Sequence, residues 1–203
     1  MNAETELDDR TIVTTNLQTL QISIDEYRRR EEMAQTRHEY RDGEVVPMTG
    51  GTYEHNGIAL NWVTYLNLGR RDRSYQVRAG DMRLWIPQYQ QAVYPDVLVI
   101  AGEPRFNGDR RDEILNPCLI VEVLSPSTEA RDRGDKFRYY QSIPEFREYL
   151  LVHQTEPRVE QFLRRDEKEW SLRLYDRRDT TISLGAIVLD ISLQEIYQGI
   201  LER

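Results

Sequence analysis

The stretch Pro117-Cys118-Leu119-Ile120-Val121-Glu122-Val123-Leu124-Ser125-Pro126-Ser127-Thr128 decides the fold of this chain. It is an apolar run of strand length, rich in β-branched residues and bounded by prolines, which is typical of a central β-strand. Alternate residues of a strand fall on opposite faces, and both faces here are apolar, so we expect both to be buried. Glu122 is the exception. A glutamate in such a strand is paired, protonated or bound to a cation, unless it lies at the strand end and reaches solvent or an arginine.

A second central strand is predicted directly after Tyr94-Pro95-Asp96, because the run Val97–Ile100 is continuously apolar. Asp96 either only opens this strand after a proline or supplies a second carboxylate. Neighbouring strands lie ~4.8 Å apart, so Asp96 and Glu122 on adjacent strands could hold one small divalent cation. Mg²⁺ suits this arrangement, because it takes one or two carboxylates and keeps positions for water and a phosphate oxygen. Such a metal polarises a phosphodiester and lowers the pKa of a bound water.

Lys136 is the candidate for the cationic group of this site. The sequence holds only two lysines, Lys136 and Lys168, and Lys136 lies near the start of a helix predicted over Arg131–Ser142. The chain can fold back there over the end of the Glu122 strand, and a cation at that place would help to neutralise the charge of a transition state. The alternative is an i,i+4 ion pair between Lys136 and Asp132 on an exposed helix face.

The remaining pattern predicts a mixed α+β fold with a central mixed β-sheet flanked by helices. An extra helix and hairpin come first: Ser23 and Glu26 form a capping box, and Asp42-Gly43 is a strong hairpin signal. We predict a flexible arm over residues 1–20 and a single domain over residues 21–203. Further helices are expected over Tyr53–Gly69 and Leu193–Leu201, and strands over Tyr75–Arg78, Met82–Ile86, Phe146–His153, Arg158–Arg165, Trp170–Tyr175 and Thr181–Leu189. Ala101–Asn116 is expected to be a polar connection that forms either a short strand or a lid.

Composition restricts the classes of function. A net charge of −8 and a pI near 5.1 argue against a protein that coats nucleic acid through bulk charge, although they leave room for a local basic groove. Arg131, Arg133, Arg138 and the Arg70–Arg73 run either contact a phosphate backbone or are solvated charges. The single Cys118 fits a reducing cytoplasm. No apolar run approaches membrane length, so we predict a cytoplasmic protein without a membrane segment.

Several of these motifs together resemble a known family. Tyr94-Pro95-Asp96-Val97, the Glu-Val-Leu-Ser-Pro-Ser-Thr block over 122–128, Asp132-Arg133-Gly134-Asp135-Lys136 and Ile143-Pro144-Glu145 look like the Uma-type putative restriction endonuclease family of the PD-(D/E)XK nuclease superfamily. Glu39-Tyr40-Arg41-Asp42-Gly43-Glu44 and His55 resemble its N-terminal pattern. The similarity spans about residues 20 to 200.

The resemblance implies a restriction-endonuclease-like core and metal-dependent hydrolysis of DNA phosphodiester bonds. Asp96 and Glu122 would be the ligands of Mg²⁺ or Mn²⁺, with the backbone carbonyl of Val123 as a further ligand. Lys136 would orient water or neutralise charge, and Glu44 and His55 would complete the site as an extra acid and an imidazole that contacts water or phosphate. The resemblance also favours a homodimer, because nucleases of this fold often act as dimers when they cut both strands.

One position departs from the superfamily pattern. The Glu-x-Lys motif places its lysine two residues after the glutamate, where this chain has Leu124. Either Lys136 replaces that lysine from the helix, or the site has lost part of its machinery. The alternative function is therefore a catalytically inactive nuclease fold that acts as a binding or scaffolding module. A hydrolase that acts on RNA or another phosphodiester is a second alternative.

Overall fold

Strand β9 (Leu119–Leu124) runs through the middle of a six-stranded mixed sheet, as its apolar sequence predicts. The structure is a computed structural model that describes residues 21–70 and 74–201, so the predicted arm over residues 1–20 lies outside the described residues, as do Arg71 and Arg73. The strand order of this sheet is β12-β11-β10-β9-β6-β3. β9 pairs in parallel with β10 (Glu148–His153) and antiparallel with β6 (Val97–Ala101). The other members are β3 (Tyr75–Ala79), β11 (Val159–Arg164) and β12 (Trp170–Tyr175).

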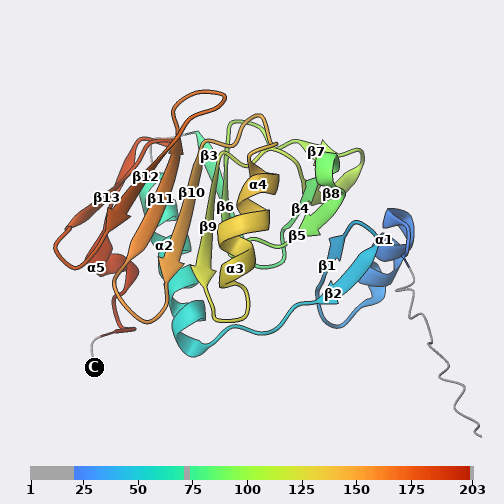
Figure 1. Cartoon of the computed structure of the whole chain (residues 1–203), viewed down its shortest axis with the longest axis horizontal. Helices are drawn as coiled ribbons and strands as arrows, with labels where there is room; N and C mark the ends of the chain where they lie inside the picture. Colours follow the sequence, from blue (N-terminus) through green and yellow to red (C-terminus); the bar gives the residue numbers. More distant parts are fainter. Residues whose placement is uncertain (1–20, 71–73, 202–203) are drawn as a thin grey trace, which may run out of the picture.

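Helices cover both faces of this central sheet (Figure 1). On one face, α2 (Tyr53–Gly69) buries Ile58, Trp62 and Leu66 against the odd-numbered residues of β6 and β9. On the other face lies a helix in three parts: α3 (Glu129–Arg131), the π-helical turn η2 (Asp132–Lys136) and α4 (Phe137–Tyr140). Its aromatic residues pack with the even-numbered residues of the same two strands. Both faces of β9 are therefore buried, as predicted.

A second six-stranded sheet, with the order β2-β1-β5-β4-β8-β7, packs with the N-terminal helix. Only one central sheet was predicted, and β5 was not predicted. The polar segment Ala101–Asn116, predicted as a connection with a short strand or a lid, forms two strands, β7 and β8. These strands are short or polar, so their pairing is a tertiary effect rather than a local propensity. The elements are α1 (Ile24–Met33), β1 (His38–Arg41), β2 (Glu44–Pro47), β4 (Arg83–Ile86), η1 (Pro87–Tyr89), β5 (Gln91–Val93), β7 (Phe106–Asn107) and β8 (Arg110–Ile114).

The C-terminal segment differs in detail from the prediction. The single strand expected over Thr181–Leu189 is a hairpin of β13 (Thr181–Leu184) and β14 (Leu189–Ser192). The closing helix α5 covers only Leu193–Ile196, shorter than the predicted helix. In the described part of the chain, no helix has both the length and the apolar character that crossing a membrane requires.

The capping box at Ser23 and the turn at Asp42-Gly43 are present, as predicted. The Ser23 hydroxyl accepts a hydrogen bond from the backbone amide of Glu26 at the start of α1. The hairpin between β1 and β2 turns at Asp42 and Gly43, which have φ angles of 47° and 98°. Positive φ at both central residues matches the twist of a two-residue hairpin, which explains the Asp-Gly pair.

Gly43→Ala should destabilise the protein by about 1–2 kcal/mol, because a side chain at positive φ is strained. An added Cβ would also lie 3.0 Å from the Cβ of Gln21. Gly50→Ala is the matched control, since a Cβ there meets nothing within 4 Å. Denaturant unfolding measures both variants, and an equal loss in the two would contradict the role assigned to the turn.

Candidate active site

Asp96 and Glu122 lie across from each other on the face of the central sheet that α3, η2 and α4 cover. The antiparallel register of β6 and β9 pairs Val97 with Val121, so the next pair outward is Asp96 and Glu122. Residues directly opposite in an antiparallel pair project to the same face. The Asp96 Oδ2 atom accepts a hydrogen bond of 2.7 Å from the backbone amide of Val123, which fixes the aspartate at the end of its strand.

Lys136, on the helix, contacts Glu122, on strand β9. Its Nζ lies 3.0 Å from Oε1 of Glu122 and 2.8 Å from Oδ1 of Asp132. Lys136 is 6% exposed and Glu122 is 3% exposed, so this ion pair is buried. The i,i+4 pair with Asp132 therefore exists, but it faces the sheet rather than solvent, which excludes the alternative of an exposed pair.

The π-helical turn η2 presents both charged residues to the sheet. Asp132 and Lys136 are its first and last residues, and both are buried. A π turn is wider than an α turn and is found frequently at functional sites. The hydroxyl of Tyr149 donates to the backbone carbonyl of Asp132 at 3.0 Å and so anchors the turn on β10.

The opposite side of the same turn is held by a second ion pair. Arg133 donates to both oxygens of Glu160 on β11, at 2.6 and 2.9 Å, and His153 Nε2 lies 3.0 Å from Oε1 of that glutamate. A bidentate arginine–carboxylate pair fixes geometry as well as contributing energy. The rotation of η2 about its axis is therefore set from two directions.

Tyr140 on α4 is fully buried, and its hydroxyl is part of the site. It donates a hydrogen bond of 2.7 Å to Oε1 of Glu122. Burial raises the pKa of Tyr140 well above its usual value, and the negative charge of Glu122 raises it further, so the phenol stays a neutral donor. Oε1 thus carries two donors, Lys136 and Tyr140.

The charge state of Glu122 reflects competing influences. Burial is the strongest and raises the pKa of its carboxyl group to about 8. The ammonium group of Lys136 opposes this rise, whereas the charges of Asp132 and Asp96 add to it. Burial lowers the pKa of Lys136, but Glu122 and Asp132 outweigh it and the net shift is upward, so the ammonium is charged. A buried group of this kind takes up either a proton or a cation.

His55 joins the site from the first turn of α2. Thr52 caps this helix by accepting the amide of His55, and His55 Nε2 lies 3.3 Å from Oδ2 of Asp96. The hydrogen bond to Asp96 raises the pKa of His55, burial opposes the rise, and the charges of Asp96, Glu122 and Asp132 add to it. The predicted residues Asp96, Glu122, Lys136 and His55 therefore form one electrostatic cluster.

Glu44 does not join this cluster. Its side chain is exposed at the start of β2, and within the described residues it makes no hydrogen bond or ion pair with the others. Glu39, on the paired strand β1, is the acid of the hairpin that approaches the site: it is buried and contacts Arg131. Both glutamates belong to the predicted hairpin, but only Glu39 is buried, and its contact with Arg131 of α3 joins residues far apart in sequence.

The donor set fits a hard divalent cation. Oδ1 of Asp96 and Oε2 of Glu122 accept no hydrogen bond from the residues that the structure describes, while the second oxygen of each carboxylate does. Within residues 21–70 and 74–201, no three His, Cys, Asp or Glu side chains form a ready-made metal cage. Mg²⁺ is held through one or two carboxylates with water and substrate oxygens, so a two-carboxylate site suits it.

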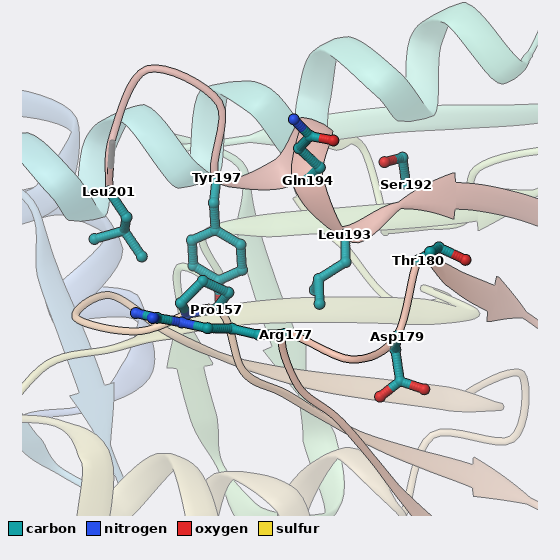
Figure 2. Close-up of a pocket in the computed structure, with 9 residues that line it drawn as sticks. All are labelled: Pro157, Arg177, Asp179, Thr180, Ser192, Leu193, Gln194, Tyr197 and Leu201. Atoms are coloured by element: carbon teal, nitrogen blue, oxygen red, sulfur yellow. The ribbon is translucent and has the colours of Figure 1, made fainter. Parts of the chain in front are cut away.

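A separate surface cavity of about 370 Å³ lies beside α5. Figure 2 shows Pro157, Arg177, Asp179, Leu193 and Tyr197 among the side chains around it. None of the residues of the carboxylate cluster lines this cavity. It is therefore not part of the site.

The sheet order, the helices on both faces and the paired carboxylates define the class of restriction-endonuclease-like proteins. The chain belongs to the Uma2 family, described as "Putative restriction endonuclease", whose model matches residues 24–194. The sequence resemblance to this family is thereby confirmed.

Relatives and a solved structure agree with this assignment. The uncharacterized protein sll1609 of Synechocystis sp. is 41% identical over 147 residues, which cover 72% of this chain and 83% of the relative. The uncharacterized protein slr1290 of the same organism is 35% identical over 181 residues, covering 88% and 93%. The crystal structure of a putative nuclease belonging to DUF820 from Anabaena variabilis superposes with a TM-score of 0.70 at 16% identity, covering 89% of this chain and 99% of that one, and shows the same fold.

Tyr140→Phe should lower the free energy of unfolding by about 1–3 kcal/mol, because it leaves a buried carboxylate without one of its donors. Tyr65→Phe is the control, since the Tyr65 hydroxyl donates to Gln198 at an exposed place. We expect that change to be within about 0.5 kcal/mol. Similar losses in the two variants would show that the Glu122 contact has no special weight.

In the Glu160→Gln variant, the free energy of unfolding should decrease less steeply with falling pH than in the native protein. Burial raises the pKa of Glu160, but its hydrogen bonds with Arg133 and His153 prevail and lower it to about 2. Because the folded pKa lies below the unfolded value of about 4.3, this carboxylate stabilises the fold above that value. The contribution disappears as the pH falls towards 2. Unfolding measured from pH 5 to 2 tests this, with the exposed Glu156→Gln as control; identical curves for both variants would rule it out.

Proposed function

We propose that this protein is a metal-dependent endonuclease that hydrolyses DNA phosphodiester bonds at the Asp96–Glu122–Lys136 cluster. The observation that supports the proposal is the contact of a buried ammonium with a carboxylate that has a second oxygen free of protein donors. Asp96 and Glu122 would hold Mg²⁺, or Mn²⁺ in its place, with the Val123 carbonyl as a further ligand. When bound, the metal polarises the phosphodiester and lowers the pKa of a water molecule.

The side chains of this chain have distinct parts in such a reaction. The two carboxylates bind and orient the metal, and Tyr140 keeps Glu122 in place through its hydroxyl. Lys136 supplies a fixed positive charge for the additional negative charge that develops on the phosphate. His55, held by Asp96, lies where its imidazole can orient a water or a phosphate oxygen through Nδ1, since Nε2 faces the carboxylate.

Asp132 is the residue of the cluster that sequence analysis did not assign. Lys136 shares its ammonium between Glu122 and Asp132, so Asp132 can retain the ammonium when Glu122 turns to a metal. The replacement of the superfamily lysine by Leu124 does not leave the site without a cation, because Lys136 contacts the glutamate from the helix. This contact favours an enzyme over an inactive scaffold.

Asp96→Asn, Glu122→Gln and Lys136→Met should each reduce cleavage by at least about 100-fold, the usual cost of removing a charge-stabilising group. A plasmid-nicking assay with Mg²⁺ or Mn²⁺ measures the rate, and EDTA should abolish it. Asp135→Asn is the matched control, because Asp135 lies in the same turn but is exposed and forms an ion pair with the exposed Arg138.

Metal binding measured by calorimetry gives a readout that does not depend on turnover. Native protein should bind Mn²⁺, and the Asp96 and Glu122 variants should lose that binding. A native chain that neither binds a divalent metal nor cuts any DNA tested would instead be a nuclease fold without turnover. Parallel assays on RNA test the alternative substrate. The homodimer and the cytoplasmic location stay predictions.

A further inference from the structure

We propose that Arg131 binds a phosphate group of the nucleic acid beside the carboxylate cluster, and that Glu39 on β1 positions it. This inference rests on the proposed nuclease function and extends it by naming the residue that receives the charge of the substrate. It also gives the N-terminal hairpin a part in the site.

Arg131 connects the hairpin to the helix that carries Lys136. It is the last residue of α3 and directly precedes Asp132 in η2. Its Nη1 donates to Oε2 of Glu39, a residue that is 5% exposed. Arg41, on the same strand, donates to the same oxygen through Nη2 at 2.9 Å and Nε at 3.2 Å. Oε2 of Glu39 thus accepts hydrogen bonds from two guanidinium groups.

The charges around Glu39 favour an anion beside Arg131. Arg41 and Arg131 share the one carboxylate of Glu39, which leaves this group of three side chains with one positive charge in excess. Lys136 is matched separately by the two carboxylates of Glu122 and Asp132, so the excess belongs to the two arginines. This cluster adjoins the metal-site residues: burial raises the pKa of Glu39, but the charge of Lys136, followed by that of Arg131, lowers it overall. A phosphate would meet the excess positive charge of Arg131 and Arg41.

Arg131 also has an unused hydrogen-bonding group. Its Nη2 is buried and has no hydrogen-bond partner among the described residues, although the side chain as a whole keeps 19% of its exposure. A buried donor without an acceptor costs stability. A phosphate oxygen that arrives at the exposed edge can supply the acceptor after a small turn of the guanidinium, whose planar fork suits phosphate.

The competing explanation for the Glu39–Arg131 ion pair is that it only holds the hairpin against α3. An ion pair with this purely structural role would affect folding stability but not the salt dependence of DNA binding. Each protein–phosphate contact steepens the plot of log affinity against log salt by about 0.9 for duplex DNA. The salt slope therefore separates the two roles.

The test is fluorescence anisotropy with a labelled DNA duplex in EDTA over a range of salt concentrations, using the full chain. Arg131→Met should weaken binding about 10-fold and reduce the slope by about 1. Arg138→Met is the control, because it removes the same charge from α4, where Arg138 is exposed and paired with Asp135. Its slope should remain that of the native protein. Arg131→Lys retains the charge and should retain the slope, which guards against loss through misfolding.

Combining Glu39→Gln with Arg131→Met tests the positioning role of Glu39. Glu39→Gln should weaken DNA binding in the native background but add nothing in the Arg131→Met background, because it acts through Arg131. Thermal midpoints confirm that each variant is folded. Additive losses would overturn the positioning role, and a native slope for Arg131→Met would overturn the phosphate contact.

Failure of this inference is distinguishable from failure of the proposed function. Binding in EDTA needs no turnover, so a chain that binds DNA through Arg131 without cutting it would refute only the hydrolysis. A chain that cuts DNA through Asp96 and Glu122, with an Arg131→Met slope like that of the native protein, would refute only the phosphate contact.

Discussion

The buried ammonium of Lys136, held between Glu122 and Asp132, is the interaction on which the site depends. Removing three charged groups from water is expensive, and their mutual attraction offsets this cost only when the geometry is good and further hydrogen bonds complete it. Here Tyr140 supplies one of those bonds to Glu122. The Lys136–Glu122 ion pair joins the helix to strand β9 at one register. Two carboxylates against one ammonium also leave a negative charge in the core, which a proton or a divalent cation can neutralise.

The helix opposite β9 is constrained from both of its sides, and this explains its irregular turn. Asp132 and Lys136 face Glu122, while Arg133 between them reaches Glu160 on β11. The wide turn of η2 allows neighbouring residues to serve these two directions. The aromatic residues of α4 then close the apolar side, where the Phe137 ring stacks on Tyr149 with their centroids 5.3 Å apart. Electrostatics and packing thus specify the same orientation.

Short sequence patterns predicted those parts of the fold that depend on the conformation of neighbouring residues. The apolar runs of β6 and β9, the capping box at Ser23 and the Asp42-Gly43 turn were readable because each reflects propensity or a backbone angle. The short strand β5 was not readable, since its three residues form a strand only through partners distant in sequence. The helix end near Tyr197 was also missed.

The residues of the candidate site also divide into those that the local sequence predicts and those that depend on tertiary packing. Asp96 and Glu122 could be paired in advance, because both stand beside apolar strands and match a family motif. The ion pair of Asp132 with Lys136 could also be predicted, but its place in the site could not, since an i,i+4 spacing is the same whether that helix face is exposed or buried. The environment of Leu124 explains why the positive charge beside Glu122 comes from the helix and not from the strand. It is 4% exposed and packs in the apolar cluster that contains Tyr140 and Tyr149. A leucine there fills the core, while the flexible stem of Lys136 brings the ammonium to the same glutamate from the helix. The proposed hydrolysis requires a positive charge beside the carboxylate, and the fold can supply that charge from the strand or from the helix.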